Sequence, residues 1–122
     1  MDEIITKEVI EVRQHLVNEI GNARNLTDNV SIHDVFLSAE GIIADLAFLI
    51  KPIADLEQIY RSEVVTQMMD NEISHAKAEQ IAKAGNTYKE WIKMKRLTDL
   101  ADEQIKILKK FRDDLNKEWA RT

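Results

Sequence analysis

The feature that most constrains this sequence is the segment 35–59, its most apolar part and the location of its only proline, Pro52. On a helix of about 3.6 residues per turn, the apolar residues in and just before this segment form a wide stripe and a narrower stripe on another side. The wide stripe contains Ile32, Val35, Phe36, Ala39, Ile42, Ile43, Leu46, Leu49 and Ile50. The narrow stripe contains Leu37, Ala44 and Phe48. A helix that is apolar on more than one side must be covered on more than one side, so we expect a central helix with neighbours around it.

A membrane span is the competing interpretation of so apolar a segment. A span requires roughly 20 consecutive, nearly uncharged residues, and Asp45, Lys51 and Asp55 interrupt this one. The first twelve residues are acidic and amphipathic, whereas a secretory signal has basic residues followed by an apolar run. The sequence therefore predicts no membrane contact and a cytoplasmic location.

The composition favours a single helical domain over residues 1–122. Three glycines and one proline leave few places for turns, which favours a few long helices over many strands. A chain of this length can bury roughly two-thirds of the surface that its unfolded form exposes. Because it has no cysteine, it can form neither disulfides nor thiolate metal sites, which fits a reducing compartment.

Apolar periodicity and capping residues divide the chain into helices at about 3–24, 32–51, 53–70, 75–84 and 88–119. Ser31 with Asp34, and Thr87 with Glu90, form capping arrangements before the second and the last of them. Pro52 lacks an N–H, and its ring would clash with the carbonyl four residues earlier. It therefore either kinks one helix or separates two. We expect an all-α, elongated bundle of about four to five helices.

The last of these helices is long for a chain of this size. About 32 residues extend on the order of 48 Å, whereas a compact globule of this length is roughly 35 Å across. Either the bundle is elongated or one end of the helix projects and pairs with another subunit, so we expect a homo-oligomer. Tyr88 and Ile92 lie away from its main apolar stripe, with Trp91 at the margin of that stripe. Either the short helix before them folds back over Tyr88 and Ile92, or they contact a second chain.

The formal net charge of −5 is distributed unevenly along the chain. Residues 1–70 contain 13 acidic and 5 basic side chains, whereas residues 71–122 contain 9 acidic and 12 basic ones. Such asymmetry can indicate a nucleic-acid or membrane surface. The favoured interpretation is that an acidic helix pair packs beside a basic helix.

An acidic face accompanies the apolar stripe of the first helix. Spacings of three and four place that stripe at Ile5, Val9, Val12, Leu16, Ile20 and Ala23. The acidic face consists of Glu8, Glu11, His15 and Glu19. Carboxylates and an imidazole on adjacent turns can hold a metal ion, but no second helix supplies recognisable further ligands. We therefore favour a solvated face on which the carboxylates raise the pKa of His15, and we expect no metal or other cofactor.

Two acidic motifs correspond to fragments of helical enzyme sites. Glu72-x-x-His75 has the spacing of di-iron bundles, which need this pair twice together with further inward glutamates. Glu8-x-x-Glu11 matches half of the acidic motif of all-helical nucleotide pyrophosphohydrolases, but no Glu-x-x-Asp follows at a suitable distance. The sequence also lacks a phosphate-binding glycine loop, a nucleophile elbow and a serine triad. A metal- or nucleotide-dependent enzyme is thus the least favoured interpretation, and we expect no enzymatic activity.

Four basic residues surround Trp91 near the start of the last helix, namely Lys89, Lys93, Lys95 and Arg96. Cations beside an aromatic ring can bind phosphates and stack a base. Acidic residues are interleaved along most of this helix, however, and the whole chain is acidic. Nucleic-acid binding is therefore the alternative to protein binding.

The second half of the chain contains several runs of helix-forming residues. These runs are Ser74-x-Ala76-x-Ala78-Glu79, Ala82-Lys83-Ala84, Tyr88-Lys89, Ala101-x-Glu103-x-Ile105-Lys106-x-Leu108-Lys109 and Glu118-Trp119. In these runs the chain resembles small all-helical proteins of phages and prophages, which tend to be encoded among early genes. The resemblance implies an accessory protein in the cytoplasm of a bacterial host that binds a host or phage protein, including an inhibitor of host defence. It implies no residue roles, so the candidate contacts remain the acidic face, the side chains of Tyr88, Trp91 and Ile92, and the four basic residues around Trp91.

Overall fold

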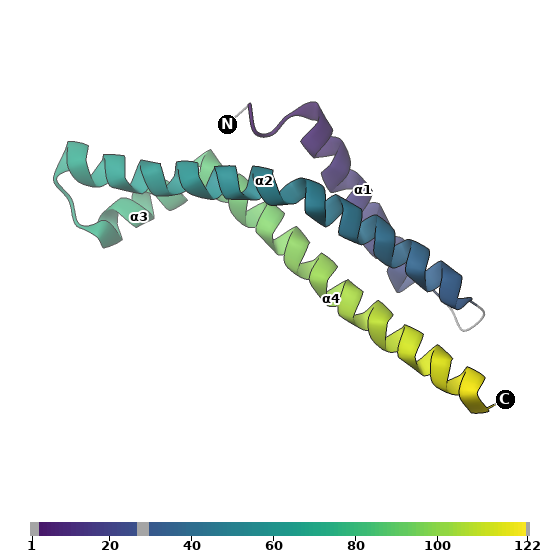
Figure 1. Cartoon of the computed structure of the whole chain (residues 1–122). Coiled ribbons are helices and arrows are strands. Elements are labelled where there is room, and N and C mark those ends of the chain that lie inside the picture. The colour runs from purple at the N-terminus through teal and green to yellow at the C-terminus, as the bar shows by residue number, and fades with distance from the viewer. Residues whose placement is uncertain (1–2, 27–29, 122) are drawn as a thin grey trace.

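The computed structural model describes residues 3–26 and 30–121, which form four α-helices and no strand. The helices are α1 (Lys7–Arg24), α2 (Ile32–Asn71), α3 (His75–Lys83) and α4 (Asn86–Arg121). α1 and α2 run antiparallel, and α4 returns along α2, so the three long helices make an elongated bundle (Figure 1). The expected all-α bundle with a long C-terminal helix is confirmed. Within the described ranges, no helical segment has the length and hydropathy that a bilayer crossing requires.

Side chains of α1, α2 and α4 form the main core. The largest fully buried ones are Leu16, Ile42, Leu49, Leu56 and Met94. The buried residues of α1 all belong to the apolar stripe expected from periodicity, and they are Val9, Leu16, Ile20 and Ala23. The helix begins at Lys7, later than the expected Glu3. The reason is that the Thr6 hydroxyl accepts a 3.2 Å hydrogen bond from the backbone N–H of Val9 and caps the helix there.

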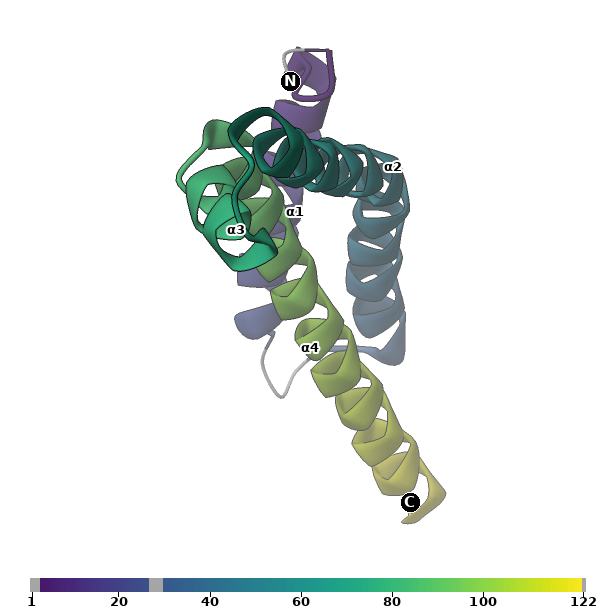
Figure 2. The same ribbon diagram turned by 90° about the vertical axis from the view of Figure 1, so that its left-hand side faces the viewer.

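α2 is one helix of 40 residues that contains Pro52, so the expected helices 32–51 and 53–70 are continuous. Proline cannot donate a backbone hydrogen bond, and its ring pushes away the carbonyl of Phe48. The missing hydrogen bond and the displaced carbonyl bend a helix without ending it when the residues on both sides remain helical. Figure 2 shows that the axis of α2 changes direction between its blue N-terminal half and its teal C-terminal half. The structure therefore has the first of the two expected outcomes, a kink in one helix.

Replacing Pro52 with alanine should raise the free energy of unfolding by about 1 kcal/mol. The new N–H can donate to the carbonyl of Phe48, while the freer unfolded chain offsets a few tenths of a kcal/mol of this gain. Urea denaturation of both proteins at equal concentration measures the difference. A loss of about 1 kcal/mol or more would contradict this expectation and indicate that the packing of α2 depends on the bend.

The two expected capping arrangements have different outcomes. At the start of α2, the Ser31 hydroxyl accepts from the backbone N–H of Asp34, and the Asp34 carboxylate accepts from that of Ser31. At the start of α4, the Thr87 hydroxyl instead donates to Glu63 Oε1 of α2 at 2.9 Å, and Thr87 is buried. The second capping box is therefore wrong, because a residue distant in sequence binds the Thr87 side chain.

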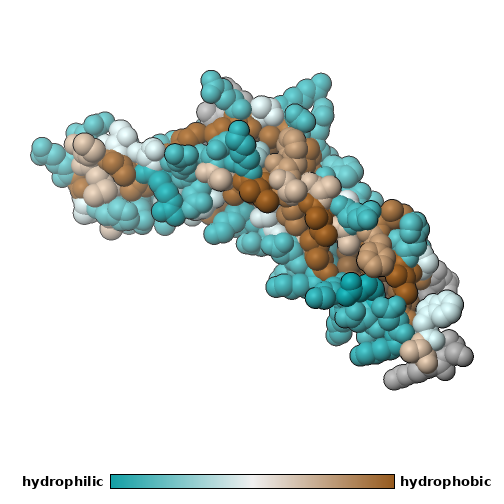
Figure 3. Space-filling view, viewed as in Figure 1, coloured by the Kyte–Doolittle hydropathy of each residue, from teal (hydrophilic) through white to brown (hydrophobic). Residues whose placement is uncertain are grey.

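The N-terminal half of α2 is covered on one side only, so the expectation of neighbours on several sides is wrong there. The buried members of its wide stripe are Val35, Ile42 and Leu49. The large exposed members of the two stripes are Phe36 (48%), Leu37 (52%), Ile43 (52%), Phe48 (38%) and Ile50 (67%). Figure 3 shows apolar side chains gathered along this part of α2 on the face toward the viewer. α1 and α4 pack against the buried side, and α4 also borders the exposed face at Phe36 and Ile43, which leaves the rest of this face open.

α3 packs against the C-terminal half of α2 and the start of α4 in a second core cluster. The buried residues of this cluster are Tyr60, Val64, Ala78 and Ala82. Two more rings pack against them, with ring centroids 5.1 Å apart for Tyr60 and Tyr88 and 5.4 Å apart for Tyr60 and Trp91. Tyr88 was expected either to be covered by the short helix before it or to contact a second chain. The structure shows the first arrangement, because Tyr88 packs against the cluster that contains α3.

Candidate functional site

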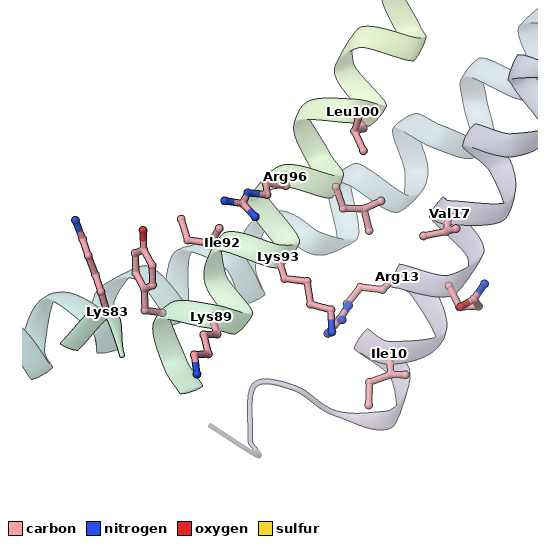
Figure 4. Close-up of a pocket in the computed structure, with 12 residues that line it drawn as sticks. Ile10, Arg13, Val17, Lys83, Lys89, Ile92, Lys93, Arg96 and Leu100 are labelled. Atoms are coloured by element: carbon pink, nitrogen blue, oxygen red, sulfur yellow. The ribbon is translucent and has the colours of Figure 1, made fainter. Parts of the chain in front are cut away.

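An apolar groove with a basic rim lies between α1 and α4, beside the last residue of α3 (Figure 4). Its volume is about 760 Å³. The apolar lining consists of Ile10, Val17, Ile92, Leu97 and Leu100. The polar lining consists of Arg13, Gln14, Lys83, Tyr88, Lys89, Lys93 and Arg96. Five of the seven polar residues are cationic, so the groove combines an apolar floor with concentrated positive charge.

Helical spacing brings these side chains to one place, because residues three or four apart share a helix face. Along α4, spacings of four, three and four align Lys89, Lys93, Arg96 and Leu100. Along α1, spacings of three and four align Ile10, Arg13 and Val17. In Figure 4 the side chains of Arg13 and Lys93 extend toward each other across the groove. Neither helix forms the site alone.

Most of the positive charge in the groove is not neutralised. Arg13 Nη1 lies 3.1 Å from Glu90 Oε2, and this ion pair joins α1 to α4. Lys83 Nζ lies 5.9 Å from the centre of the Tyr88 ring. In the described part of the chain, no carboxylate lies within ion-pair distance of Lys89, Lys93 or Arg96. Because gathered like charges repel, an anionic group that enters the groove lowers the electrostatic free energy of the site.

The residues expected around Trp91 separate into two groups. Tyr88, Lys89, Ile92, Lys93 and Arg96 line the groove. Trp91 lies outside it, half-buried among the rings of the second core cluster, with Lys95 Nζ 5.5 Å from its ring centre. An indole already packed on Tyr60 has little ring surface left to stack a nucleic-acid base. The expected combination of cations and a stacking Trp91 is therefore not assembled at one place.

The acidic face of α1 is centred on an ion pair that the sequence did not predict. His15 Nδ1 lies 2.6 Å from Oδ2 of Asp45 on α2, and His15 Nε2 lies 3.6 Å from Glu19 Oε1. The pKa of His15 is raised, chiefly by the hydrogen bond to Asp45 and by the charge of Asp45, with a smaller contribution from Glu19. The expected raised pKa is therefore confirmed, but its main cause is a buried carboxylate on the neighbouring helix. Glu8 and Glu11 are exposed.

The candidate metal ligands do not converge. Among the described residues, no group of three or more histidine and acidic side chains could hold a metal ion. Glu72 occupies the C-cap of α2 with φ 52°, in the left-handed region that favours glycine. His75 forms an exposed pair with Glu79 of its own helix at 3.6 Å. Glu72 and His75 thus mark the turn between α2 and α3.

Sequence reasoning missed the α1 side of the groove. Ile10 and Val17 are both exposed and lie seven residues apart, outside the buried stripe of α1. An apolar pair seven residues apart with Arg13 between its members was the sequence pattern that could have indicated this side of the groove. What the sequence could not indicate is that this row faces the lysine row of α4, since the crossing of the two helices depends on the core between them.

No family model, curated protein or solved structure matches this chain. No residue role can therefore be carried over from a characterised relative. What the groove can bind must follow from its shape and its charge.

Proposed function

We propose that this protein is a non-enzymatic helical module that binds another protein, and that the groove between α1 and α4 receives an acidic amphipathic helix of that partner. The observation that carries the proposal is the combination of five cationic side chains with an apolar floor. Amphipathic helices bind in apolar grooves through side chains at helical spacing. Carboxylates on the flanks of such a helix would meet Lys89, Lys93 and Arg96.

The apolar floor favours a protein over a nucleic acid as the occupant. A phosphate backbone would neutralise the cations but would leave Ile10, Val17 and Leu100 facing a polar chain. Base stacking could offset that cost, but Trp91 is packed against Tyr60. An acidic helix satisfies both the cations and the apolar side chains. Nucleic acid therefore remains the second candidate, carried by the unpaired cations alone.

The resemblance of residues 60–119 to phage and prophage proteins supports a particular setting for this activity. A small accessory protein of a mobile element acts on proteins of its host or of the phage itself. We therefore propose a bacterial or phage protein as the partner, with components of host defence as one class to test. The acidic face of α1 lies outside the groove lining and is not assigned a partner.

The substitution Lys93→Glu tests the groove directly. The probe is a synthetic helix of about 18 residues with leucines on one face and glutamates on the other, and fluorescence anisotropy measures its binding. Lys93→Glu should weaken binding about tenfold, the equivalent of about 1.4 kcal/mol, because it places a carboxylate among those of the peptide. Val17→Asp should have a similar effect through the apolar floor.

Lys110→Glu is the matched control, since it makes the same charge change at an exposed position of α4 outside the groove. It should change the affinity less than about twofold. The proposal fails if the groove and control variants bind the peptide alike. It also fails if a single-stranded oligonucleotide binds more tightly than the peptide, with a steep salt dependence that Lys93→Glu abolishes.

A further inference from the structure

The open face of α2 has a central row of four exposed residues at spacings of four, three and four, namely Glu40, Ala44, Ala47 and Lys51. Exposed apolar side chains flank the row on both sides. Phe36, Ile43 and Ile50 lie on one side, and Leu37 and Phe48 lie on the other. This arrangement has small residues at its centre, where another helix could approach closely, and large apolar residues at its borders. The apolar band along α2 in Figure 3 lies in this region.

The two charged residues of this row are placed symmetrically about its centre. Glu40 lies four residues before Ala44, and Lys51 lies four residues after Ala47. Within the described chain, neither has an ion-pair partner. If the same face of a second α2 packs against it in the antiparallel direction, Glu40 of each copy lies opposite Lys51 of the other. The dimer then contains two such pairs. A parallel arrangement would instead oppose like charges.

We propose that this face is covered by a second copy of the chain, in a two-fold symmetric, antiparallel α2–α2 dimer. Such an interface is self-complementary, because the same patch serves on both protomers. In the register set by Glu40 and Lys51, Ala44 lies opposite Ala47 of the partner copy. Because the two-fold axis brings each border against the same border of the partner, Ile43 lies beside Ile50 of the partner copy. The paired segment ends before Pro52, so it lies in the N-terminal half of α2, ahead of the bend.

The size of the patch agrees with this occupant. From their exposed fractions, the five flanking side chains present on the order of 500 Å² of apolar surface. A standard interface buries about 800 Å² per partner, of which somewhat more than half is apolar. The face can therefore supply the apolar part of a stable dimer interface. It shares no residue with the groove between α1 and α4, so the dimer and the proposed partner binding are independent.

Charge exchange between Glu40 and Lys51 tests both the surface and the orientation. Sedimentation equilibrium of the wild-type chain should give twice the 14.1 kDa monomer mass. Either single change, Glu40→Lys or Lys51→Glu, opposes like charges at two places and should weaken the dimer tenfold or more. The double change E40K/K51E restores opposite charges and should return the dimer to within a few-fold of wild type. Asp102→Lys, an exposed charge reversal on α4, should leave the mass unchanged.

Three results would overturn the proposal. A wild-type chain that remains monomeric at about 100 μM, well above the dissociation constant of a standard interface, shows that no second copy covers the face. A dimer that Ala47→Glu does not weaken uses another surface. Single variants that dissociate without rescue by the double variant exclude the antiparallel register. Circular dichroism on each variant verifies that the helices remain folded.

Discussion

Replacing Leu49 with alanine is expected to lower the free energy of unfolding by about 3 kcal/mol. Leu49 is fully buried in the core that α2 shares with α1 and α4. The substitution removes buried apolar surface and leaves a cavity that three packed helices cannot fill completely. Urea denaturation followed by circular dichroism, with wild type and variant at equal concentration, measures the change.

Leu100→Ala is the matched control, because it deletes the same atoms from a side chain that is 44% exposed on α4. It should cost less than about 1 kcal/mol. If the two variants lose similar stability, Leu49 does not occupy the core position that the structure gives it. The arrangement of α2 against α1 and α4 would then be wrong.

The second large effect is expected at the pair formed by His15 and Asp45. Replacing His15 with alanine leaves the largely buried carboxylate of Asp45 without its partner. An unsatisfied buried charged group costs on the order of 1–3 kcal/mol. We therefore expect His15→Ala to destabilise the protein near pH 6 by an amount in this range, although the imidazole itself is partly exposed.

This contribution should depend on pH in a defined direction. The folded state raises the pKa of His15 above its ordinary value of 6.5, because the protonated ring donates to Asp45. The folded chain then binds this proton more tightly than the unfolded chain does. The stabilisation is fully present below about pH 6.5 and is lost as the pH rises through the higher pKa of the folded state.

Urea denaturation at a series of pH values from 5.5 to about 8.5 covers this window. Wild type should lose stability with rising pH relative to both His15→Ala and Asp45→Asn, since either variant removes the pair. His75→Ala, which changes an exposed histidine of α3, should keep the wild-type dependence. If the stability of Asp45→Asn depends on pH as that of wild type does, the dependence comes from groups other than this pair.

Local signals predicted much of the fold. The apolar stripe of α1 gave its buried face, because spacings of three and four put Val9, Leu16 and Ile20 on one side of a helix. The Ser31–Asp34 box marked the start of α2, since its hydrogen bonds join residues three apart. The expected start of the first helix, Glu3, lies before the observed start at Lys7, because Thr6 caps the helix through its own hydroxyl. In each case the deciding interaction joins residues only three or four positions apart in the chain.

The candidate site was predicted only in part, because its two sides come from different helices. The lysine row of α4 and Arg96 were recognised, but the facing Ile10, Arg13 and Val17 were not. Trp91, at the margin of the apolar stripe, was considered as a stacking ring among the cations, whereas contacts with Tyr60 hold it in the second core cluster. The pairing of His15 with Asp45 and of Thr87 with Glu63 likewise joins separate helices.

By itself, the sequence determined that this chain is helical, which residues of α1 are buried, and that α4 is long. These properties depend on periodicity and on contacts within a turn or two, which a linear pattern contains. Only the tertiary structure decided how many sides of α2 are covered, how α2 passes Pro52, and that two rows of side chains form one basic groove. Those outcomes depend on where helices cross, and crossing is set by core packing between residues far apart in the chain.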